Sequence, residues 1–536
     1  MPPTTTPTSA VPLEQLMDGS KPSLDELYRT VHVPGSCYVL VHGMWYDMGP
    51  FLSRHPGGRA ALMLGAGRDA TALFESGHVF ADKKKVAAVL AKHRLSDDSV
   101  RSLGLKTLDS AVQDDTDINR HVAWSFDSEF RQAIVSRVRS HFEAEARRRG
   151  LSVARATKAT PAKWALIVST FFVFLGCIAM LMRGNWPFIV LTPLAGWFCG
   201  VNCFHDALHF SLSSNPTVNS IVGAMFPFFA SSFAWYHQHM IGHHVHTNLE
   251  YLDPDLVHGT DIRRDHAAHP LTVMHKRQSR FLNVAFHFVV GTWLGLGLVN
   301  DFKLIFSPTK SYNGFTPRMP VSTFKLITHT ISRIIYYVLQ FGWPFWMLPQ
   351  GTWFITRLAY SVLPAMVFSV LFMVNTQINH LTPSAMKTQS LDWTIHQIIT
   401  AQNFGDPEKG GIAWWFHLLF SGGLNLQMEH HLFPTVNHCH LTAVSKIVKA
   451  TCIEFAVPYT RVSGYWEGMT EYMKHTDNMT RDVLPSTAGV SCTMSASSSI
   501  STSPEDASRD SDEESTIVGA ADDVAPVKDL ESKKED

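Results

Sequence analysis

Histidine is concentrated in three short stretches, each with a spacing that suits metal binding. The stretches are His205-Asp-Ala-Leu-His209, His239-Met-Ile-Gly-His243-His244 and Gln427-Met-Glu-His430-His431. Positions i and i+4 of a helix share one face, so two imidazoles spaced in this way can reach one metal ion. Imidazole nitrogen suits iron, copper, nickel and zinc alike. Because seven imidazoles exceed the needs of one tetrahedral zinc ion, we predict a dinuclear centre.

Four carboxylates lie close to these stretches in the sequence: Asp206, Asp253, Asp255 and Glu429. Carboxylates near metal-binding histidines commonly orient the imidazole rings through hydrogen bonds, and we predict that role here. The neighbouring region is rich in further histidines, which we predict are not ligands: His237, His246, His266, His269 and His275.

A second pair of histidines, His55 and His78, stands in the motifs SRHPGG and FESGH. A b-type haem held by protein alone needs nitrogen ligands on opposite faces of its iron. One histidine on a Pro-Gly-Gly turn and another after a helix could supply them, since glycine lets the backbone approach the macrocycle. The HPGG motif alone fits an exposed histidine on a turn equally well.

The composition limits the class of protein. The chain has 536 residues, so two or more domains are expected. A net charge of −1 provides no basic field for nucleic acid. The seven scattered cysteines form no zinc-type pair and favour a reducing environment over a disulfide scaffold. The N-terminus shows no signal-peptide pattern, so membrane insertion would use internal spans.

Apolar segments long enough to cross about 30 Å of hydrocarbon form two pairs. These are Trp164–Met182 with Trp186–Phe204, and Ile331–Leu348 with Phe354–Val374. Arginines and lysines precede the first span, so its N-terminal end is predicted to be cytosolic. Two hairpins then leave all three histidine stretches on that same face. The apolar stretch Asn283–Val299 is predicted to be interfacial, because a further single crossing would separate the clusters.

The chain divides into five predicted parts. The N-terminus 1–21 and the Ser/Asp/Glu-rich tail 486–536 are predicted to be disordered, because they cannot offset their ordering entropy by burial. Residues 22–97 are predicted to form a small α+β unit, with short strands at Tyr38–Val41 and Met44–Tyr46. A polar linker, 98–124, leads to an all-α multi-span membrane domain, 125–480, with about four transmembrane helices.

Residues 22–97 resemble the cytochrome b5 family closely, through Tyr46-Asp47, the HPGG turn and the run GRDATALFESGH. The resemblance implies that His55 and His78 are the axial ligands of a b-type haem.

Residues 125–480 resemble the membrane fatty-acid desaturases, through HDALH, QHMIGHH and QMEHH in this order between apolar spans. Gln427 replaces the first histidine of the third box, as in the front-end subgroup, whose members carry a fused b5 domain. The resemblance implies two non-haem iron ions held by the seven box histidines. It adds His380, in Gln-Ile-Asn-His380, as a further ligand, whereas Gln427 either ligates weakly or only donates a hydrogen bond. Trp235 and Asn248 frame the second box as in the family.

The resemblance also implies the reaction. Using O2, a front-end desaturase inserts a cis double bond between an existing double bond and the carboxyl end of a polyunsaturated acyl chain, carried as lipid or as acyl-CoA. Electrons would come through the fused haem from an NADH-cytochrome b5 reductase. We expect an enzyme of the endoplasmic reticulum bilayer with its haem domain and histidine boxes in the cytosol. The wording of the second box favours Δ5 or Δ4 regiochemistry, with Δ6 and Δ8 open.

Three other functions fit part of the pattern. A sphingolipid Δ8-type front-end desaturase would share the boxes and differ in substrate. A hydroxylase on this scaffold would differ only in its product. A haem-bearing electron carrier or a metal transporter belongs to a different class, and a transporter would place histidines within its spans instead of beyond their ends.

Overall fold

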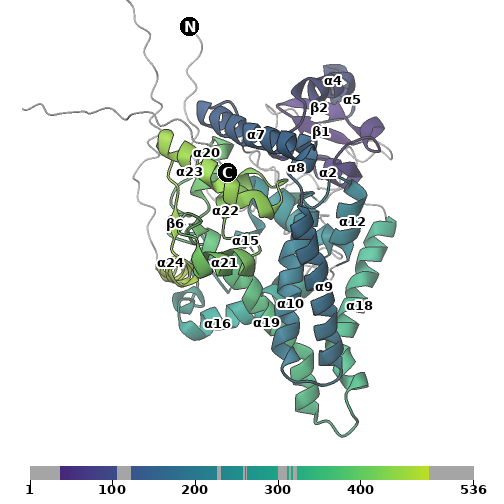
Figure 1. Cartoon of the computed structure of the whole chain (residues 1–536), viewed down its shortest axis with the longest axis vertical. Helices are drawn as coiled ribbons and strands as arrows, with labels where there is room; N and C mark the ends of the chain where they lie inside the picture. The colour runs from purple at the N-terminus through teal and green to yellow at the C-terminus, as the bar shows by residue number, and fades with distance from the viewer. Residues whose placement is uncertain are drawn as a thin grey trace, which may run out of the picture. The chain divides into compact units, whose positions relative to one another are not determined.

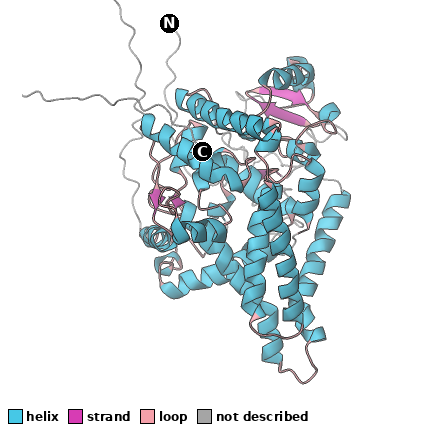
Figure 2. Cartoon of the chain, viewed as in Figure 1, coloured by secondary structure: helices cyan, strands magenta, loops and turns pink. Residues whose placement is uncertain are grey.

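The computed structural model describes residues 37–481 except 106–121, 123, 226–230, 251, 258–259, 261, 300–310, 313–315 and 318–322. The predicted disorder of residues 1–21 and 486–536 lies outside these residues. The described residues belong to one compact unit. Its described part is mostly helical, with a few short strands (Figure 2).

The N-terminal part is a small α+β unit, as predicted. Strands β1 (Tyr38–Val41) and β2 (Met44–Asp47) pair antiparallel around a turn at His42 and Gly43, both with positive φ. Such a two-residue turn matches the twist of the strands it joins. The remaining elements of the unit are η2 (Gly49–Phe51), α2 (Gly58–Met63), α3 (Thr71–Gly77), α4 (Lys83–His93) and α5 (Asp97–Ser102).

Helix α5 lies at the start of the segment predicted as a linker. Its Val100 is buried against Tyr38, Leu40 and Trp45 of the hairpin. Ser96 caps the helix by accepting a hydrogen bond from the backbone of Ser99, which starts the helix at this point. The packed part of this unit therefore continues past residue 97.

Helix α7 (Glu129–Arg149) begins the second part and covers the buried histidine-bearing segments. Phe130, Ile134, Val138 and Phe142 recur every four residues and form one buried stripe. The stripe packs in one core with apolar residues of α23 (Leu441–Glu454). At the C-terminal end of α7, Arg147 and Arg148 are exposed.

Long apolar helices carry the first histidine stretch and His380 at their ends. Three helices are long and apolar enough to cross a membrane: α9 (Pro161–Met182), the continuous helix Phe188–Leu208 and α19 (Phe354–His380). Thr160 caps α9, and Pro161 occupies its first turn, where proline is tolerated. Figure 1 shows α9, α10 (Phe188–Cys199), α18 (Thr323–Met347) and α19 running side by side, in agreement with their mutual contacts.

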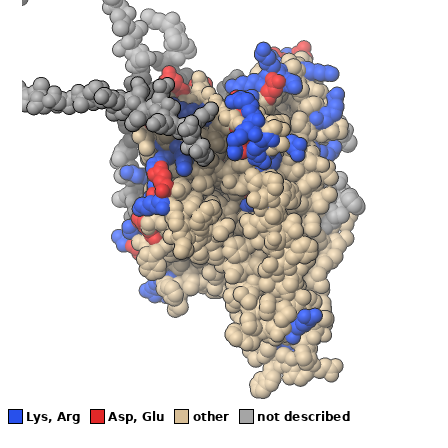
Figure 3. All heavy atoms as spheres, viewed as in Figure 1, with Lys and Arg blue, Asp and Glu red and all other residues tan. Residues whose placement is uncertain are grey.

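The outer faces of these helices are apolar. Large exposed side chains include Phe172 and Val173 of α9 and Ile331 and Ile335 of α18. Figure 3 shows few charged residues over α9 and α10, whereas Lys and Arg gather near α7 and α4. Exposed apolar surface of this extent is typical of protein that contacts lipid.

The fourth predicted span, Ile331–Leu348, overlaps α18, which is not among the three candidate spans in the described residues. The stretch predicted as interfacial forms α16 (Phe281–Val290) and the π-helix η6 (Gly291–Val299), with Phe281 and Leu282 largely exposed. Its position relative to a bilayer stays a prediction.

The other elements are short and connect the histidine-bearing segments. They are α8 (Val153–Ala156), α12 (Pro216–Ala224), α13 (Ser232–Trp235), α15 (Pro254–Val257), η5 (His275–Arg277), β3 (Ser311–Tyr312), β4 (Thr316–Pro317), α20 (Trp393–Ile399), β5 (Asn403–Phe404), α21 (Gly411–Phe420), β6 (Arg461–Val462) and α24 (Tyr465–Asn478). Strands β3 and β4 pair antiparallel, and β5 and β6 pair parallel.

Candidate functional site

Four box histidines from three distant segments converge in one buried group. His205, His209, His239 and His430 place one ring nitrogen each within 4.8 Å of the others. The Nε2 atoms of His205 and His239 are 3.0 Å apart. Nitrogen lone pairs at this separation can face one common ion, so this first group has the form of a metal site.

A second group lies beside the first. His243, His380 and His431 bring their ring nitrogens within the same 4.8 Å. The amide nitrogen of Gln427 lies 2.8 Å from Nε2 of His380 and 3.3 Å from Nε2 of His431. His244 joins the two groups, with ring centroids 4.7 Å from His430 and 4.2 Å from His431. All eight histidines named in the sequence analysis as iron ligands therefore lie in one buried region.

The second and third boxes are each divided between the two groups. His239 belongs to the first group and His243 to the second, although their i, i+4 spacing indicates one shared ion. Their rings lie nearly parallel, with centroids 5.6 Å apart, and so present their nitrogens to neighbouring points. The first box keeps its helical histidine pair, His205 and His209, in one group. Two adjacent groups fit a dinuclear centre.

π-Helical turns position two of the boxes. The turn η3 (Gly200–Phe204) directly precedes His205, which opens the short helix α11 (His205–Leu208), and η4 (Tyr236–His243) carries most of the second box before α14 (His244–His246). π-Helical turns are uncommon and recur at functional sites because they redirect side chains without ending the helix. The third box forms α22 (Gln427–Leu432).

The ring nitrogens are suited to hold metal ions. Both nitrogens of His209 and Nε2 of His430 are buried without a hydrogen-bond partner among the described residues. A buried polar atom without a partner is costly, and a metal ion would satisfy it. Burial, and next the neighbouring imidazoles, hold the pKa values of His244, His430 and His431 well below the usual range. These rings are therefore neutral, as ligation requires.

Two of the predicted orienting carboxylates contact a box histidine. Asp253 and Asp255 place carboxylate oxygens 3.0 and 3.5 Å from Nδ1 of His243. The Asp253 carboxylate can only accept a hydrogen bond, so a neutral His243 carries its hydrogen on Nδ1 and keeps the Nε2 lone pair for a metal ion. Asp206 lies 4.0 Å from His205. Glu429 accepts its hydrogen bonds from Asn403 and Tyr459 instead of orienting a box histidine among the described contacts.

Gly242 makes the approach of Asp253 and Asp255 possible. A Cβ atom at this position would collide with the ring of Pro254, which stands between the two aspartates. We expect Gly242→Ala to push the segment away from His243 and to weaken iron retention by about 10- to 100-fold, as loss of an orienting partner typically does. Iron per haem in purified protein measures this effect. Gly176→Ala, on α9 with open space around the added methyl, is the control and should retain wild-type iron.

The other histidines in the region make backbone contacts. His237 donates from Nδ1 to the carbonyl of Phe233, and His275 contacts the carbonyl of Thr260. Neither belongs to the described metal-type groups, nor do His246, His266 and His269. The sequence analysis missed His438, which is buried beside His430 and Asp206. Its only sequence signal is a histidine in the run Asn-His-Cys-His shortly after the third box.

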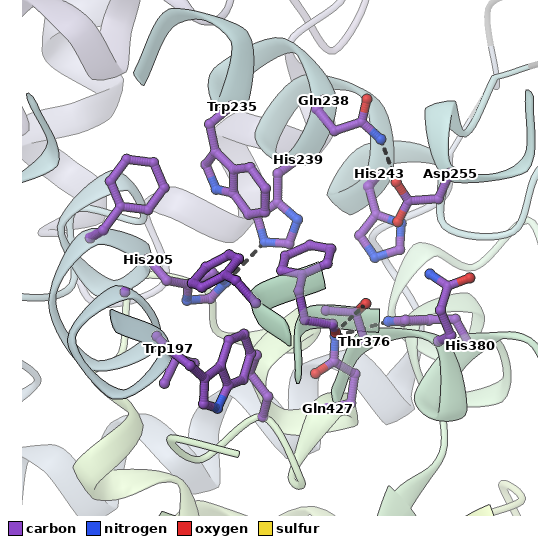
Figure 4. A pocket seen from close by; sticks show the side chains of 17 residues that line it. Trp197, His205, Trp235, Gln238, His239, His243, Asp255, Thr376, His380 and Gln427 are labelled. Carbon is purple, nitrogen blue, oxygen red and sulfur yellow. Dashed lines mark hydrogen bonds and ion pairs between the residues drawn. The ribbon is translucent and has the colours of Figure 1, made fainter. Parts of the chain in front are cut away.

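A pocket of about 780 Å³, counting the open space at its mouth, reaches both histidine groups. Its walls are mostly apolar, with Trp197, Phe204, Trp235 and Phe372 among them, while His205, His239, His243 and His380 line its polar end (Figure 4). Apolar walls with a few convergent polar groups are typical of a site for a hydrophobic ligand.

His55 and His78 lie close together in the N-terminal unit, with ring centroids 6.0 Å apart. Nδ1 of His55 contacts the carbonyl of Gly58, and Nδ1 of His78 that of Phe74, which leaves both Nε2 lone pairs for a metal. Burial, and next the charge of His78, lowers the pKa of His55 to about 4. A Cβ at Gly57 would approach the His55 ring to 3.0 Å, so glycine keeps this space open. The residues present fit a bis-histidine haem.

Comparison with known proteins agrees with this architecture. The sequence model of the cytochrome b5-like haem/steroid binding domain matches residues 23–98, and that of the fatty acid desaturases matches residues 184–463. A cytochrome b5-like unit joined to a helical domain with buried histidine groups defines a b5-fused desaturase. The chain belongs to the fatty acid desaturase family and is an oxidoreductase of its front-end, b5-fused type.

Several curated relatives cover most of the chain. It is 28% identical to the acyl-lipid (8-3)-desaturase of Mortierella alpina, over 82% of this chain and 93% of the relative. It is 25% identical to the Delta(5) fatty acid desaturase A of Dictyostelium discoideum, over 88% of this chain and 96% of the relative. It is also 28% identical to the chloroplastic acyl-lipid (7-3)-desaturase of Chlamydomonas reinhardtii, over 81% and 78%. Relatives at similar identity thus differ in regiochemistry.

Proposed function

We propose that the chain is a Δ5 front-end desaturase of polyunsaturated acyl lipids, with Δ4 activity as the second candidate. The observation that carries the proposal is the meeting of two buried histidine groups at the polar end of an apolar pocket. The relatives named as (8-3) and Delta(5) desaturases support the regiochemistry.

We propose the seven histidines of the two groups and His244 between them, with Gln427, as the holders of two non-haem iron ions. When bound, these ions supply the O2 activation that desaturation requires. The amide oxygen of Gln427 has no hydrogen-bond partner among the described residues. Rotation of the amide would turn this oxygen, which can offer a lone pair to a metal ion, toward the second group. Gln427 thus suits a weak ligand.

The apolar wall of the pocket gives the chain its part in the reaction. Trp197, Phe204 and Phe372 can hold an extended acyl chain and exclude water from it. The wall would hold one pair of neighbouring methylene groups of the acyl chain beside the histidine groups. Such fixed positioning of the reacting groups lowers the activation barrier, because they no longer have to meet by diffusion. The indole of Trp197 is itself held by a 2.7 Å hydrogen bond to the carbonyl of Phe420, so this wall is rigid.

Electrons are proposed to reach this site from the haem held by His55 and His78. Within the compact unit, Arg131 of α7 donates to the carboxylate of Glu75 in α3 at 2.6 Å and to the hydroxyl of Thr394 in α20 at 3.2 Å. Gln397, one turn further along α20, accepts from Nδ1 of His431 at 2.8 Å. One helix therefore connects the haem-side contact to the second histidine group.

The Arg131 contact provides a test of donor docking. A hydrogen bond to a charged group contributes about 1.5–3 kcal/mol, so Arg131→Ala is expected to slow reoxidation of the reduced haem by about tenfold or more while haem content stays unchanged. Stopped-flow absorbance of the haem with acyl substrate and O2 measures the rate. Arg148→Ala on the same helix, whose arginine pairs only with Glu145 at an exposed position among the described contacts, is the matched control. Equal rates in both variants would contradict the docking role.

The substrate proposal is tested by product analysis. Yeast expressing the chain is fed separate polyunsaturated acids, and the new double bonds are mapped in the phospholipid and acyl-CoA pools. A Δ5 product supports the proposal, whereas a Δ4 product selects the second candidate. Desaturated sphingoid bases would instead identify a sphingolipid enzyme, and products heavier by one oxygen would identify a hydroxylase. We also propose an NADH-cytochrome b5 reductase as the electron source and the endoplasmic reticulum membrane as the location. This assay does not test either of them.

A further inference from the structure

His438 lies behind the first histidine group, in contact with it but outside it. It opens the short turn η7 (His438–His440) and is 3% exposed. Its Nε2 atom lies 3.2 Å from Nδ1 of His430. Its Nδ1 atom lies 3.1 Å from the carboxylate of Asp206 and 2.9 Å from the carbonyl of Gly422. Both ring nitrogens of His438 are thus engaged.

The carboxylate at the far end of this contact is fully buried, and one of its oxygens is held by two side chains. Asp206 is 0% exposed. Lys163 of α9 lies 3.4 Å from its second oxygen, and Asn437 donates a hydrogen bond to that oxygen at 2.9 Å. Lys163 also donates to Asn202 at 2.6 Å. Lys163 and Asn437 hold Oδ2, whereas Oδ1, the oxygen nearest His438, has no hydrogen-bond partner among the described residues. The hydrogen bond from Nδ1 of His438 goes to the Gly422 carbonyl, and the Asp206 charge at 3.1 Å favours a hydrogen on that nitrogen.

The turn before the third box is shaped to admit His438. Gly422 and Gly423 both have positive φ, a conformation that side chains rarely adopt. A Cβ at Gly423 would meet Cβ of His438 at 2.8 Å. The two glycines therefore allow the Gly422 carbonyl to reach Nδ1 of His438.

These contacts determine where the protons lie. The Asp206 carboxylate and the Gly422 carbonyl are acceptors only, so Nδ1 of a neutral His438 carries the hydrogen. Its Nε2 atom then has a lone pair and accepts a hydrogen bond from Nδ1 of His430. His430 is left with its lone pair on Nε2, the nitrogen that lies in the first group without a hydrogen-bond partner among the described residues.

We propose that His438 is a positioning residue that holds His430 in the tautomer and ring orientation needed to bind iron. The chain of contacts from Asp206 through His438 to His430 places a second imidazole between the carboxylate and the proposed ligand. The other histidine group uses a shorter arrangement, in which Asp253 contacts His243 directly. This inference rests on the proposed role of His430 as an iron ligand.

Two substitutions separate this role from a purely structural one. In His438→Asn, the shorter side chain places its amide only at the position of Nδ1, so this variant keeps the contact with Asp206 and Gly422 and loses the acceptor for His430. The longer side chain in His438→Gln places an amide oxygen near the position of Nε2 and keeps that acceptor. Each purified full-length variant is titrated with an iron chelator, with haem per protein as the internal measure of folding.

We expect His438→Asn to release its non-haem iron at about 10- to 100-fold lower chelator concentration than wild type, and His438→Gln to stay within about threefold of it. The reverse order, or iron retention by the Asn variant equal to that of wild type, would overturn the proposal. If the Asn variant does not fold, loss of iron from a folded Gln variant overturns it, and retention by the Gln variant supports it. Wild-type protein without non-haem iron would refute the proposed function instead, which keeps the two failures distinct.

Discussion

Replacing His55 by alanine is expected to abolish haem binding and to reduce desaturation to the level of cells that lack the enzyme. The pair His55 and His78 presents two neutral imidazoles with both Nδ1 atoms engaged by the backbone. One remaining imidazole cannot hold a six-coordinate b-type haem. The absorbance of the purified protein gives haem content, and fatty-acid profiles of the expressing yeast give activity.

The control for this variant is His93→Ala in α4, which removes a histidine of the same unit that contacts only the Phe51 ring at 6.0 Å among the described contacts. It should retain haem and activity. Non-haem iron should remain at the wild-type level in His55→Ala, because the two metal types occupy different units. Full activity of the haem-free variant in yeast that lacks free cytochrome b5 would refute electron delivery by the fused haem.

The second large effect is expected at the third box. His430→Ala removes a fully buried imidazole that contacts the His205, His209 and His244 rings. We expect loss of at least one of the two iron ions and loss of product, because the first group would keep only three imidazoles. Haem absorbance should stay unchanged, since no described contact links His430 to the haem unit.

Metal analysis and product analysis on the same preparation test this prediction. His266→Ala is the matched control, because His266 is a partly exposed histidine between the boxes that pairs with Glu250. Two iron ions per haem in His430→Ala, with product at the wild-type level, would exclude His430 from the site. Iron loss in the control would show that the assay reports general destabilisation.

The local elements could be read from the sequence because their signals are local. The hairpin predicted at Tyr38–Val41 and Met44–Tyr46 follows from β-prone residues around a turn, and the span predicted at Trp164–Met182 follows from a nearly all-apolar run that forms most of α9. The packed helix α5 was harder to foresee, because its polar composition resembles a linker and only Val100 marks its buried side.

Spacing along the chain was a poorer guide to the grouping of the histidines. The i, i+4 rule holds for His205 and His209 but fails for His239 and His243, which lie in a π-helix and face different partners. Adjacent His430 and His431 likewise separate, with rings at 89° to one another. The assignment of Glu429 as an orienting carboxylate fails for a similar reason, since its side chain leaves α22 toward Asn403 and Tyr459.

The sequence by itself determined which chemistry is available: imidazoles in three boxes, a histidine pair for haem, and apolar helices long enough for a bilayer. These depend on residue type and short-range spacing, which folding does not alter. Only the tertiary structure decided which imidazoles share a group, that α20 connects Arg131 to His431, and that His438 supports His430. Such contacts join segments far apart in the chain, and their geometry depends on how whole helices pack.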